Sequence, residues 1–245
     1  MRLETLSCPL PGLPPELEGL RIAHLSDFHL GVPSRGESAV ERAVEWVEER
    51  QPDLTMISGD LLSRPSAEPR LRALFARLPR CFAVLGNHDF AQHTRDPFSH
   101  PAALADLEPA TLLSDDARTI ELRGKRVQIV GVDPRSYRRR LARPERFADP
   151  DADLRILLCH FPSVVDRIPE DVFDLVLAGH LHAGQICLPW PGGRLRLAHI
   201  RWTYIEGLYR RPAATLHLSA GLGTTFVPFR FLARPEATEL NLQSA

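Results

Sequence analysis

The feature that most constrains the fold is a series of short apolar runs that alternate with helical patterns. Residues 20–26, 53–58 and 81–85 are apolar runs of strand length. Helical patterns lie between them, at residues 40–47 and 71–78. Runs that are apolar throughout are typical of strands buried on both faces, and helices between such strands favour parallel pairing. The order therefore predicts an α/β fold with helical crossovers.

The first helix carries a start signal, an apolar face and a stop signal. Ser34 and Ser38 each precede a glutamate by three residues (Glu37 and Glu41), which predicts a doubled capping box. Pro52 ends the pattern, because proline cannot continue a helix. The apolar positions that share one helical face are Val40, Ala43, Val44 and Val47.

The second half of the chain is richer in predicted strands. Residues 119–122 and 127–132 flank a Gly124-Lys125 turn and predict a hairpin. Residues 154–159 and 175–178 are again short buried strands. Further short strands are predicted at residues 195–197, 202–208, 214–218 and 236–242. We find no linker and no internal repeat, and we expect a single domain over residues 1–245.

Composition excludes several classes of protein. The chain has 245 residues, of which 44% are hydrophobic and 25% charged, as in ordinary globular proteins. It lacks the run of about 18 apolar residues that a membrane-spanning helix needs, and residues 1–11 lack the layout of a signal peptide. A net charge of -1 argues against general coating of nucleic acid. The four separate cysteines suit a reducing compartment, so we expect a cytoplasmic protein.

Five predicted strands lead directly into acidic, amide or imidazole side chains. Singly, each group could be a turn or a helix cap. The carboxyl ends of parallel strands gather at one edge of a sheet, so together these groups predict a shared site. Carboxylate, amide and imidazole ligands without thiolate suit Mn, Fe or Zn in a catalytic centre. The segments are Asp27-Phe28-His29, Gly59-Asp60, Gly86-Asn87-His88-Asp89, His160 and Gly179-His180-Leu181-His182.

Three glycines precede these candidate ligands. Gly59, Gly86 and Gly179 each stand where a strand gives way to a ligand-bearing segment. Glycine lacks a side chain and permits a sharp turn, so we expect these positions to turn the chain into the site.

In this order, Asp-x-His, Gly-Asp, Gly-Asn-His-Asp, a lone His and Gly-His-x-His resemble the calcineurin-like metallophosphoesterase superfamily. The motifs cover residues 27 to 182. The start of the chain (residues 20–31) and its tail (residues 221–236) resemble a bacterial branch of that superfamily. The branch contains membrane-associated phosphoesterases and hydrolases of UDP-2,3-diacylglucosamine. The resemblance implies a four-layer α/β/β/α sandwich of two mixed sheets flanked by helices.

The resemblance also implies a role for each motif residue. Two metal ions would be bound, with Asp60 bridging them. His88 would lie near the scissile phosphate as a general acid or transition-state donor. One metal would be held by Asp27, His29 and His182, and the other by Asn87, His160 and His180.

Such a pair of metals implies hydrolysis of a phosphodiester or pyrophosphate by a metal-bridging hydroxide. Two cations about 3.5–4 Å apart lower the pKa of a bridging water and clamp the oxygens of an in-line displacement. A positioned general acid, here His88, is worth about 10²–10⁴-fold in rate.

The sequence departs from the superfamily pattern at Ser63. Many members carry an acid three residues after the bridging Asp, and it orients the catalytic His; Ser63 stands here. Either Asp89 or another acid must support His88, or its acid role is weakened. Arg64 falls where some relatives bind phosphate, and it is a candidate substrate-binding residue.

Other polar and aromatic residues lack motif support. His24 is expected in the core, Cys159 as a buried thiol, and residues 226–232 in the core of the second sheet or against an acyl chain. An arginine-rich stretch, residues 135–146, is either a solvated helix face or a flap that meets phosphate or an anionic membrane. Surface or core positions are expected for His93, His100, His199 and His217.

The sequence therefore predicts a phosphoesterase whose substrate is small or lipid-linked. Peripheral contact with a membrane is a further expectation, a stable nucleic-acid partner is not expected, and the oligomeric state stays open. Two alternatives remain. One is a nuclease of the same superfamily, disfavoured because aromatic and basic residues do not interleave. The other is a metal-binding scaffold without turnover.

Overall fold

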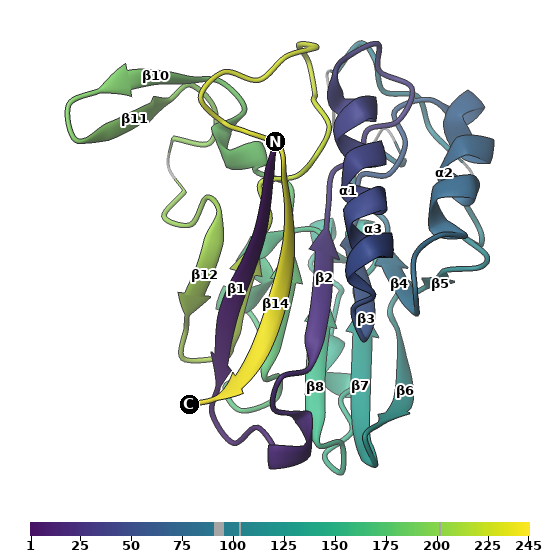
Figure 1. The fold of residues 1–245 in the computed structure, drawn as a ribbon, viewed down its shortest axis with the longest axis vertical. Coiled ribbons are helices and arrows are strands. Elements are labelled where there is room, and N and C mark those ends of the chain that lie inside the picture. Colours follow the sequence, from purple (N-terminus) through teal and green to yellow (C-terminus); the bar gives the residue numbers. More distant parts are fainter. Residues whose placement is uncertain (91–95, 103, 201) are drawn as a thin grey trace.

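The computed structural model describes residues 1–90, 96–102, 104–200 and 202–245. In these ranges the strands form two six-stranded sheets and one separate two-stranded hairpin (Figure 1). The first sheet has the order β1-β14-β2-β3-β4-β5, and the second has the order β12-β13-β9-β8-β7-β6. Each sheet contains parallel and antiparallel neighbours, so the predicted pair of mixed sheets is confirmed.

The strands of the first sheet are β1 (Arg2–Leu10), β2 (Arg21–Leu25), β3 (Leu54–Ser58), β4 (Cys81–Val84), β5 (Thr111–Leu112) and β14 (Glu236–Ser244). Those of the second are β6 (Asp116–Leu122), β7 (Lys125–Gly131), β8 (Leu154–Leu158), β9 (Leu175–Ala178), β12 (Gly207–Arg210) and β13 (Thr215–Leu218). The hairpin consists of β10 (Cys187–Trp190) and β11 (Gly193–Arg196). The helices are α1 (Gly36–Arg50), α2 (Glu68–Phe75) and α3 (Pro134–Arg138), with short 3₁₀ helices at Pro15–Leu17, Pro65–Ala67, Pro144–Arg146, Pro162–Asp166 and His182–Gly184.

Three apolar clusters hold the layers together. Between the sheets, Ile22 and Met56 of the first sheet pack in one cluster with Ile129, Ile156 and Leu177 of the second. Helices α1 and α2 cover the outer face of the first sheet (Figure 1). On the outer face of the second sheet the covering layer is thin, because it consists of α3, short 3₁₀ helices and loops.

The first helix starts differently from the prediction. It begins at Gly36, and no side chain caps it. The Ser34 hydroxyl accepts a hydrogen bond from the Gly36 amide, while Ser38 donates to the carbonyl of Arg35. Glu37 accepts from the amide of Gly31, in the loop after β2, instead of closing a capping box. The contact of Glu37 with the loop after β2 thus takes the place of the predicted capping box.

Two further elements differ from the prediction. Strand β1 was not predicted, because charged residues and a proline interrupt it; it pairs in parallel with β14 at the sheet edge. Residues 202–206 are not strand, and the strand begins only at Gly207. The reason is that Tyr204 and Ile205 serve as single buried contacts in the outer apolar cluster. No helix in the described ranges has the length and apolar character needed to cross a membrane.

Packing between the sheets predicts the effect of a core truncation. Leu177→Ala should lower the free energy of unfolding by about 2–5 kcal/mol, because the removed side chain leaves a cavity between the two sheets. The matched control is Leu195→Ala in the exposed hairpin, for which a change within about 0.5 kcal/mol is expected. Urea denaturation followed by circular dichroism measures both, and equal losses would contradict this packing.

Candidate metal centre

The ligand-bearing segments follow strands of both sheets and meet at one edge. Strands β2, β3 and β4 run parallel in the first sheet, and β8 and β9 run parallel in the second. Their carboxyl ends therefore lie on the same side of each sheet. The amide of His180, after β9, donates to the carboxylate of Asp27, after β2, at 3.1 Å and 3.2 Å. The two sheets are thus joined at the site itself.

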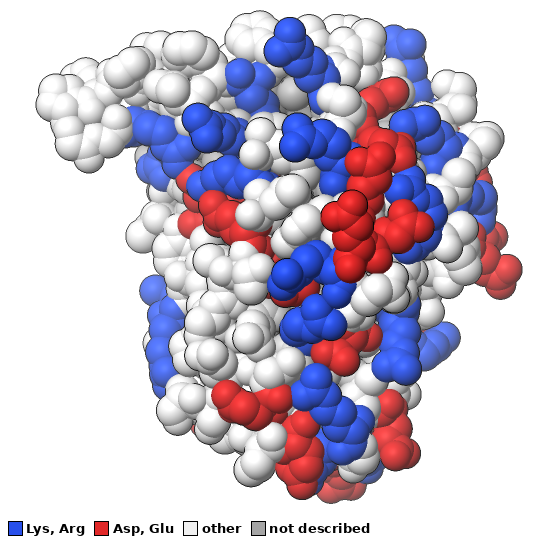
Figure 2. Space-filling model, in the orientation of Figure 1, with Lys and Arg blue, Asp and Glu red and all other residues white. Residues whose placement is uncertain are grey.

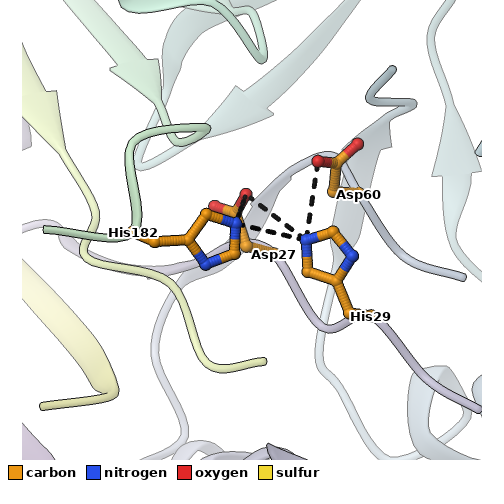
Figure 3. A group of neighbouring side chains, drawn as sticks. All are labelled: Asp27, His29, Asp60 and His182. Atoms are coloured by element: carbon orange, nitrogen blue, oxygen red, sulfur yellow. Dashed lines mark hydrogen bonds and ion pairs between the residues drawn. The ribbon is translucent and has the colours of Figure 1, made fainter. Parts of the chain in front are cut away.

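One group of ligand atoms comes from Asp27, His29, Asp60 and His182. One ligand atom from each residue lies within 4.8 Å of all the others, and all four residues are buried. Figure 3 shows the two imidazoles and two carboxylates turned toward one another. His29 Nε2 lies 3.5 Å from Asp60 Oδ2 and 3.3 Å from His182 Nε2. His182 Nε2 is 3.3 Å from Asp27 Oδ1.

A second group consists of Asp60, His160 and His180. His160 Nε2 lies 3.2 Å from Asp60 Oδ2 and 3.1 Å from His180 Nδ1. The carboxylate of Asp60 belongs to both groups. The geometry therefore places Asp60 between two clusters of potential ligands.

Asn87 adds an oxygen that lacks a partner. The residue is 5% exposed, and its Oδ1 has no hydrogen-bond partner among the described residues. A buried amide oxygen is rarely left unsatisfied, so such an atom calls for an explanation such as an ion. The amide of the next residue, His88, donates to Asp60 Oδ1 at 2.8 Å, so Asn87 lies beside the shared carboxylate.

Hydrogen bonds hold two of the imidazoles in an orientation that suits metal binding. His160 Nδ1 donates to the carbonyl of Ser58 at 2.8 Å, and His29 Nδ1 lies 3.2 Å from the Ser63 hydroxyl. When Nδ1 carries the proton, the lone pair of Nε2 faces the site, which is the usual arrangement around a bound metal. The donor set and its orientation therefore fit a metal centre.

His182 is held differently. Arg230 Nη2 lies 2.9 Å from His182 Nδ1, and a guanidinium can only donate. The proton of the neutral ring must then sit on Nε2, from which it can be donated to Asp27 Oδ1. A metal that takes His182 Nε2 has to displace this proton and change the contact with Arg230.

Five of the seven candidate ligand residues have a left-handed backbone conformation, which eleven other non-glycine residues in the described ranges share. Asp27, His29, Asp60, His180 and His182 have φ values of 54°, 47°, 55°, 79° and 49°. Side chains other than glycine rarely adopt this left-handed region, and such strain tends to gather at functional sites. The sharp turns at the strand ends are thus made largely by the ligands themselves.

Only one of the three predicted glycines is needed for a turn; the other two are needed for close packing. Gly59 has a φ of 93° and makes a turn as expected. At Gly86 and Gly179 the requirement is space: a Cβ would lie 2.0 Å from Asp60 Oδ1 and 2.5 Å from Asp27 Oδ2, respectively. These two glycines let the backbone approach the carboxylates closely.

The charges of the buried groups depend on one another. Burial lowers the pKa of His29, His180 and His182 well below the usual value, so these rings are neutral. Burial also lowers the pKa of His160, but the carboxylates of Asp60 and Asp27 outweigh it and raise that pKa to about 9. In the site without metal, a proton on His160 therefore partly balances two carboxylates, a task that a cation would take over.

His88 lies next to this cluster. Its ring centroid is 4.8 Å from that of His29, and its Nδ1 is hydrogen-bonded to the Ser99 hydroxyl. Asp96, whose side chain is fully buried, places Oδ2 3.6 Å from the same nitrogen. Asp96 and Ser99 were not predicted from the sequence, because both lie beyond the Gly-Asn-His-Asp motif in a segment that matches no motif.

Asp89 does not support His88, contrary to one expectation. Its carboxylate accepts hydrogen bonds from the amides of Leu61, Leu62 and Gly86, which tie the turn after β3 to the turn after β4. The acid that faces the His88 ring is Asp96. Ser63 contacts His29 instead of His88, since its hydroxyl faces the metal cluster.

Arg64 lies near the rim of the site. Its amide donates to the carbonyl of Leu30, next to His29, and its exposed side chain has no acidic partner within the described part of the chain. The position is compatible with phosphate binding, which stays a prediction.

The remaining histidines and Cys159 lie as follows. His24 is buried, with Nδ1 2.7 Å from His217 Nδ1. The ring of His199 is 5.7 Å from that of His180, which places it closer to the site than predicted. His93 lies outside the described residues. Cys159 is buried, and burial raises the pKa of its thiol to about 12, so it is not a nucleophile.

The arginine-rich stretch is not one helix face. Helix α3 ends at Arg138, and a separate 3₁₀ turn covers Pro144–Arg146. Arg135 pairs with Asp133, and the Arg138 guanidinium lies 5.7 Å from the centroid of Phe161. Since Phe161 directly follows His160, one end of the stretch reaches toward the site.

Known proteins support the same interpretation. A family model described as calcineurin-like phosphoesterase matches residues 20–184. The uncharacterized metallophosphoesterase YkuE of Bacillus subtilis (strain 168) is 28% identical over 244 residues, which cover 95% of this chain and 82% of that protein. The UDP-2,3-diacylglucosamine pyrophosphatase LpxG of Chlamydia trachomatis serovar D is 25% identical, covering 96% of this chain and 87% of that protein.

A likeness also exists to a solved structure, the putative 5'-nucleotidase from Staphylococcus aureus, with a TM-score of 0.47 and 16% identity. It covers 83% of this chain but only 49% of the other, so the chain spans about half the length of that structure. The family match covers all the motif segments from Asp27 to His182. This chain therefore belongs to the calcineurin-like phosphoesterase family and is a metal-dependent phosphoester hydrolase.

Proposed function

We propose that the enzyme holds two divalent metal ions. Asp27, His29 and His182 bind one; Asn87, His160 and His180 bind the other; and Asp60 bridges them. The observation that carries this proposal is the Asp60 carboxylate, which belongs to both ligand groups. The unpartnered Oδ1 of Asn87 supports the second set. Mn, Fe and Zn all suit these ligands.

Such a pair of ions would supply Lewis acidity and a water of lowered pKa for attack on phosphorus. The chain itself positions the remaining groups. In this proposal His88 holds a proton for the leaving oxygen. The contacts of its Nδ1 with Ser99 and Asp96 support this role, because they leave Nε2 free to face the substrate. Arg64 is proposed to bind a phosphate oxygen at the rim.

We propose that the substrate is a phosphodiester or pyrophosphate of a small or lipid-linked molecule. The named activity of the relative LpxG, similar along 96% of this chain, supports the pyrophosphate class and the lipid link. A lipid-linked substrate lies in a membrane, so the proposal includes peripheral contact of a cytoplasmic protein with that membrane.

Loss of a ligand tests the metal centre. Asp60→Ala and Asn87→Ala should each abolish hydrolysis of bis-p-nitrophenyl phosphate and lower the bound metal, because each variant removes a ligand oxygen. The matched control is Asp151→Ala, an exposed carboxylate, which should leave both quantities unchanged. Metal content is read by mass spectrometry beside turnover. Normal turnover by either ligand variant, with metal retained, would refute the proposal.

A second pair of variants tests the support of His88. Asp96→Asn should lower kcat by part of the about 10²–10⁴-fold that a general acid provides, with little change in KM. Asp89→Asn should instead lower the free energy of unfolding by about 1–3 kcal/mol, because it disturbs three amide hydrogen bonds. Kinetics and denaturation of both variants separate the roles; an unchanged kcat in Asp96→Asn would exclude Asp96 as the positioning acid.

The lipid link predicts a preference for acylated substrates. A UDP-sugar pyrophosphate with two acyl chains should show a higher kcat/KM than the same compound without them, because the chains add apolar contact area. The two compounds are compared below their aggregation limits, with bis-p-nitrophenyl phosphate as the reference activity. Equal kcat/KM values would remove the lipid from the proposal and leave the hydrolase intact.

A further inference from the structure

Exposed apolar side chains are concentrated on one part of the molecule. In the described ranges, twelve large hydrophobic residues are exposed, and nine of them fall in the hairpin region and in the loop before β14. Exposed apolar residues scattered singly need no explanation, but a concentrated group marks an interaction site. The nine are Leu188, Trp190, Leu195, Leu197, Ile200, Phe226, Phe229, Phe231 and Leu232.

The hairpin and the loop form a single surface. The amide of Cys187 donates to the carbonyl of Phe231 at 2.9 Å, and Ile186 forms a parallel bridge with the same residue. Arg194 donates to the carbonyl of Leu232. We call residues 187–200 and 225–232 the apical surface.

The hairpin itself lacks the support of a larger sheet. Strands β10 and β11 pair with each other and with neither six-stranded sheet, and the hairpin projects from the body at its upper left (Figure 1). An isolated two-stranded hairpin is marginal in water. Its tip sequence is Pro189-Trp190-Pro191-Gly192, and Trp190 is 61% exposed. Tryptophan is enriched where proteins meet the membrane–water boundary.

Arginines without acidic partners lie beside the apolar side chains. Arg35 and Arg42 line a cavity of about 520 Å³ together with Pro228 and Phe229, and no acidic residue is among its lining. The side chains of Arg35, Arg42 and Arg234 are exposed and form no ion pair within the described ranges. Figure 2 shows the hairpin as a white projection, with blue and red side chains on the body below it. An apolar projection flanked by free cations matches an anionic lipid surface.

The apical surface is connected to the metal centre. Gln185, three residues after His182, exchanges hydrogen bonds with Thr225 and with the carbonyl of Val227. The ring of Phe226 lies edge-on to His88, with centroids 6.5 Å apart. Arg230 reaches from the same loop to His182. A membrane that covered the apical surface would therefore lie at the mouth of the site.

We propose that the apical surface binds an anionic lipid bilayer, with Trp190 and the exposed phenylalanines at the boundary between headgroups and acyl chains. Arg35, Arg42 and Arg234 contact the lipid phosphates. The use of this contact for catalysis rests on the proposed lipid-linked substrate. Binding of the protein to the bilayer does not depend on that substrate. A second protein would also fit an apolar surface, but the unpaired arginines and the projecting tryptophan favour lipid.

Vesicle binding tests the proposal with the full chain and without substrate. The protein should co-sediment with vesicles that contain 30% phosphatidylglycerol in phosphatidylcholine, weakly with phosphatidylcholine alone, and less at high salt. Brominated lipids should quench the fluorescence of Trp190, and Trp190→Phe should remove that quenching although Trp46 and Trp202 remain. If the protein binds neither the anionic nor the neutral vesicles, the proposal is overturned.

Two matched comparisons locate the contact. Trp190→Ala with Phe229→Ala should lower the partition coefficient by at least about tenfold, whereas Phe147→Ala, exposed elsewhere, should not. Arg35→Glu with Arg42→Glu should weaken binding to the anionic vesicles about fivefold or more per arginine, and the control Arg118→Glu should not. Equal binding by all variants would place the contact elsewhere.

Two measurements distinguish a failure of the membrane proposal from a failure of the proposed hydrolase function. All these variants should hydrolyse bis-p-nitrophenyl phosphate like the unmodified enzyme, because none of the substituted residues belongs to the metal centre. Loss of that turnover in the unmodified chain would contradict the proposed function and not the membrane contact. Light scattering coupled to size exclusion detects the rival occupant: a dimer that Trp190→Ala dissociates, with no vesicle binding, would show that a second copy covers the surface.

Discussion

The Asp60 carboxylate is the group on which the site depends, because it meets side chains from both sheets in a buried position. It is 1% exposed and lies between His29 of the first sheet and His160 of the second. A buried carboxylate needs paired charge and hydrogen bonds, or its burial is strongly unfavourable. The amide of His88 and the proton on His160 meet this need only in part while Asp27 adds a second negative charge. A cation held by each of the two ligand groups would complete the charge balance.

The parts of the fold that were predicted are those in which local pattern and tertiary role agree. Strands β2, β3, β8 and β9 are apolar because they are buried on both faces. The polar residues that follow them in sequence are brought together in the fold, so the order of the motifs predicted this cluster of side chains. Strand β1 escaped prediction because an edge strand exposes alternate polar residues, and its partner β14 lies at the far end of the chain. The roles of Asp96, Ser99 and Arg230 escaped for a related reason. Each of their contacts joins segments that come together only in the folded chain, so the spacing of residues in the sequence does not reveal it.

Arg230 connects the loop of the apical surface to the cluster of candidate metal ligands. Its guanidinium is bonded to the carbonyls of Gly223, Ala220 and His182 and to the ring of His182, so the loop that carries the apical surface is anchored on a predicted metal ligand. Burial lowers the pKa of this guanidinium to about 10, which leaves it charged at neutral pH. A cation on His182 would repel that charge and require the ring to give up its present bond to Arg230. If a metal binds at His182, the contact between this ring and the loop has to change.

This connection bears on how one site could serve a substrate that is half water-soluble and half apolar. The metal ligands need a buried, polar setting, whereas acyl chains need apolar surface that water does not favour. The chain meets both needs by placing the ligands at strand ends and the exposed Trp190 and Phe229 on segments that start or end next to them. In the proposed arrangement, a phosphoester at the level of the lipid headgroups would lie close to the ligand residues. In the same arrangement, the apolar surface binds the acyl part of the substrate and the ligand cluster binds its phosphate part. The hydrogen bonds of Gln185 and Arg230 fix the position of one relative to the other.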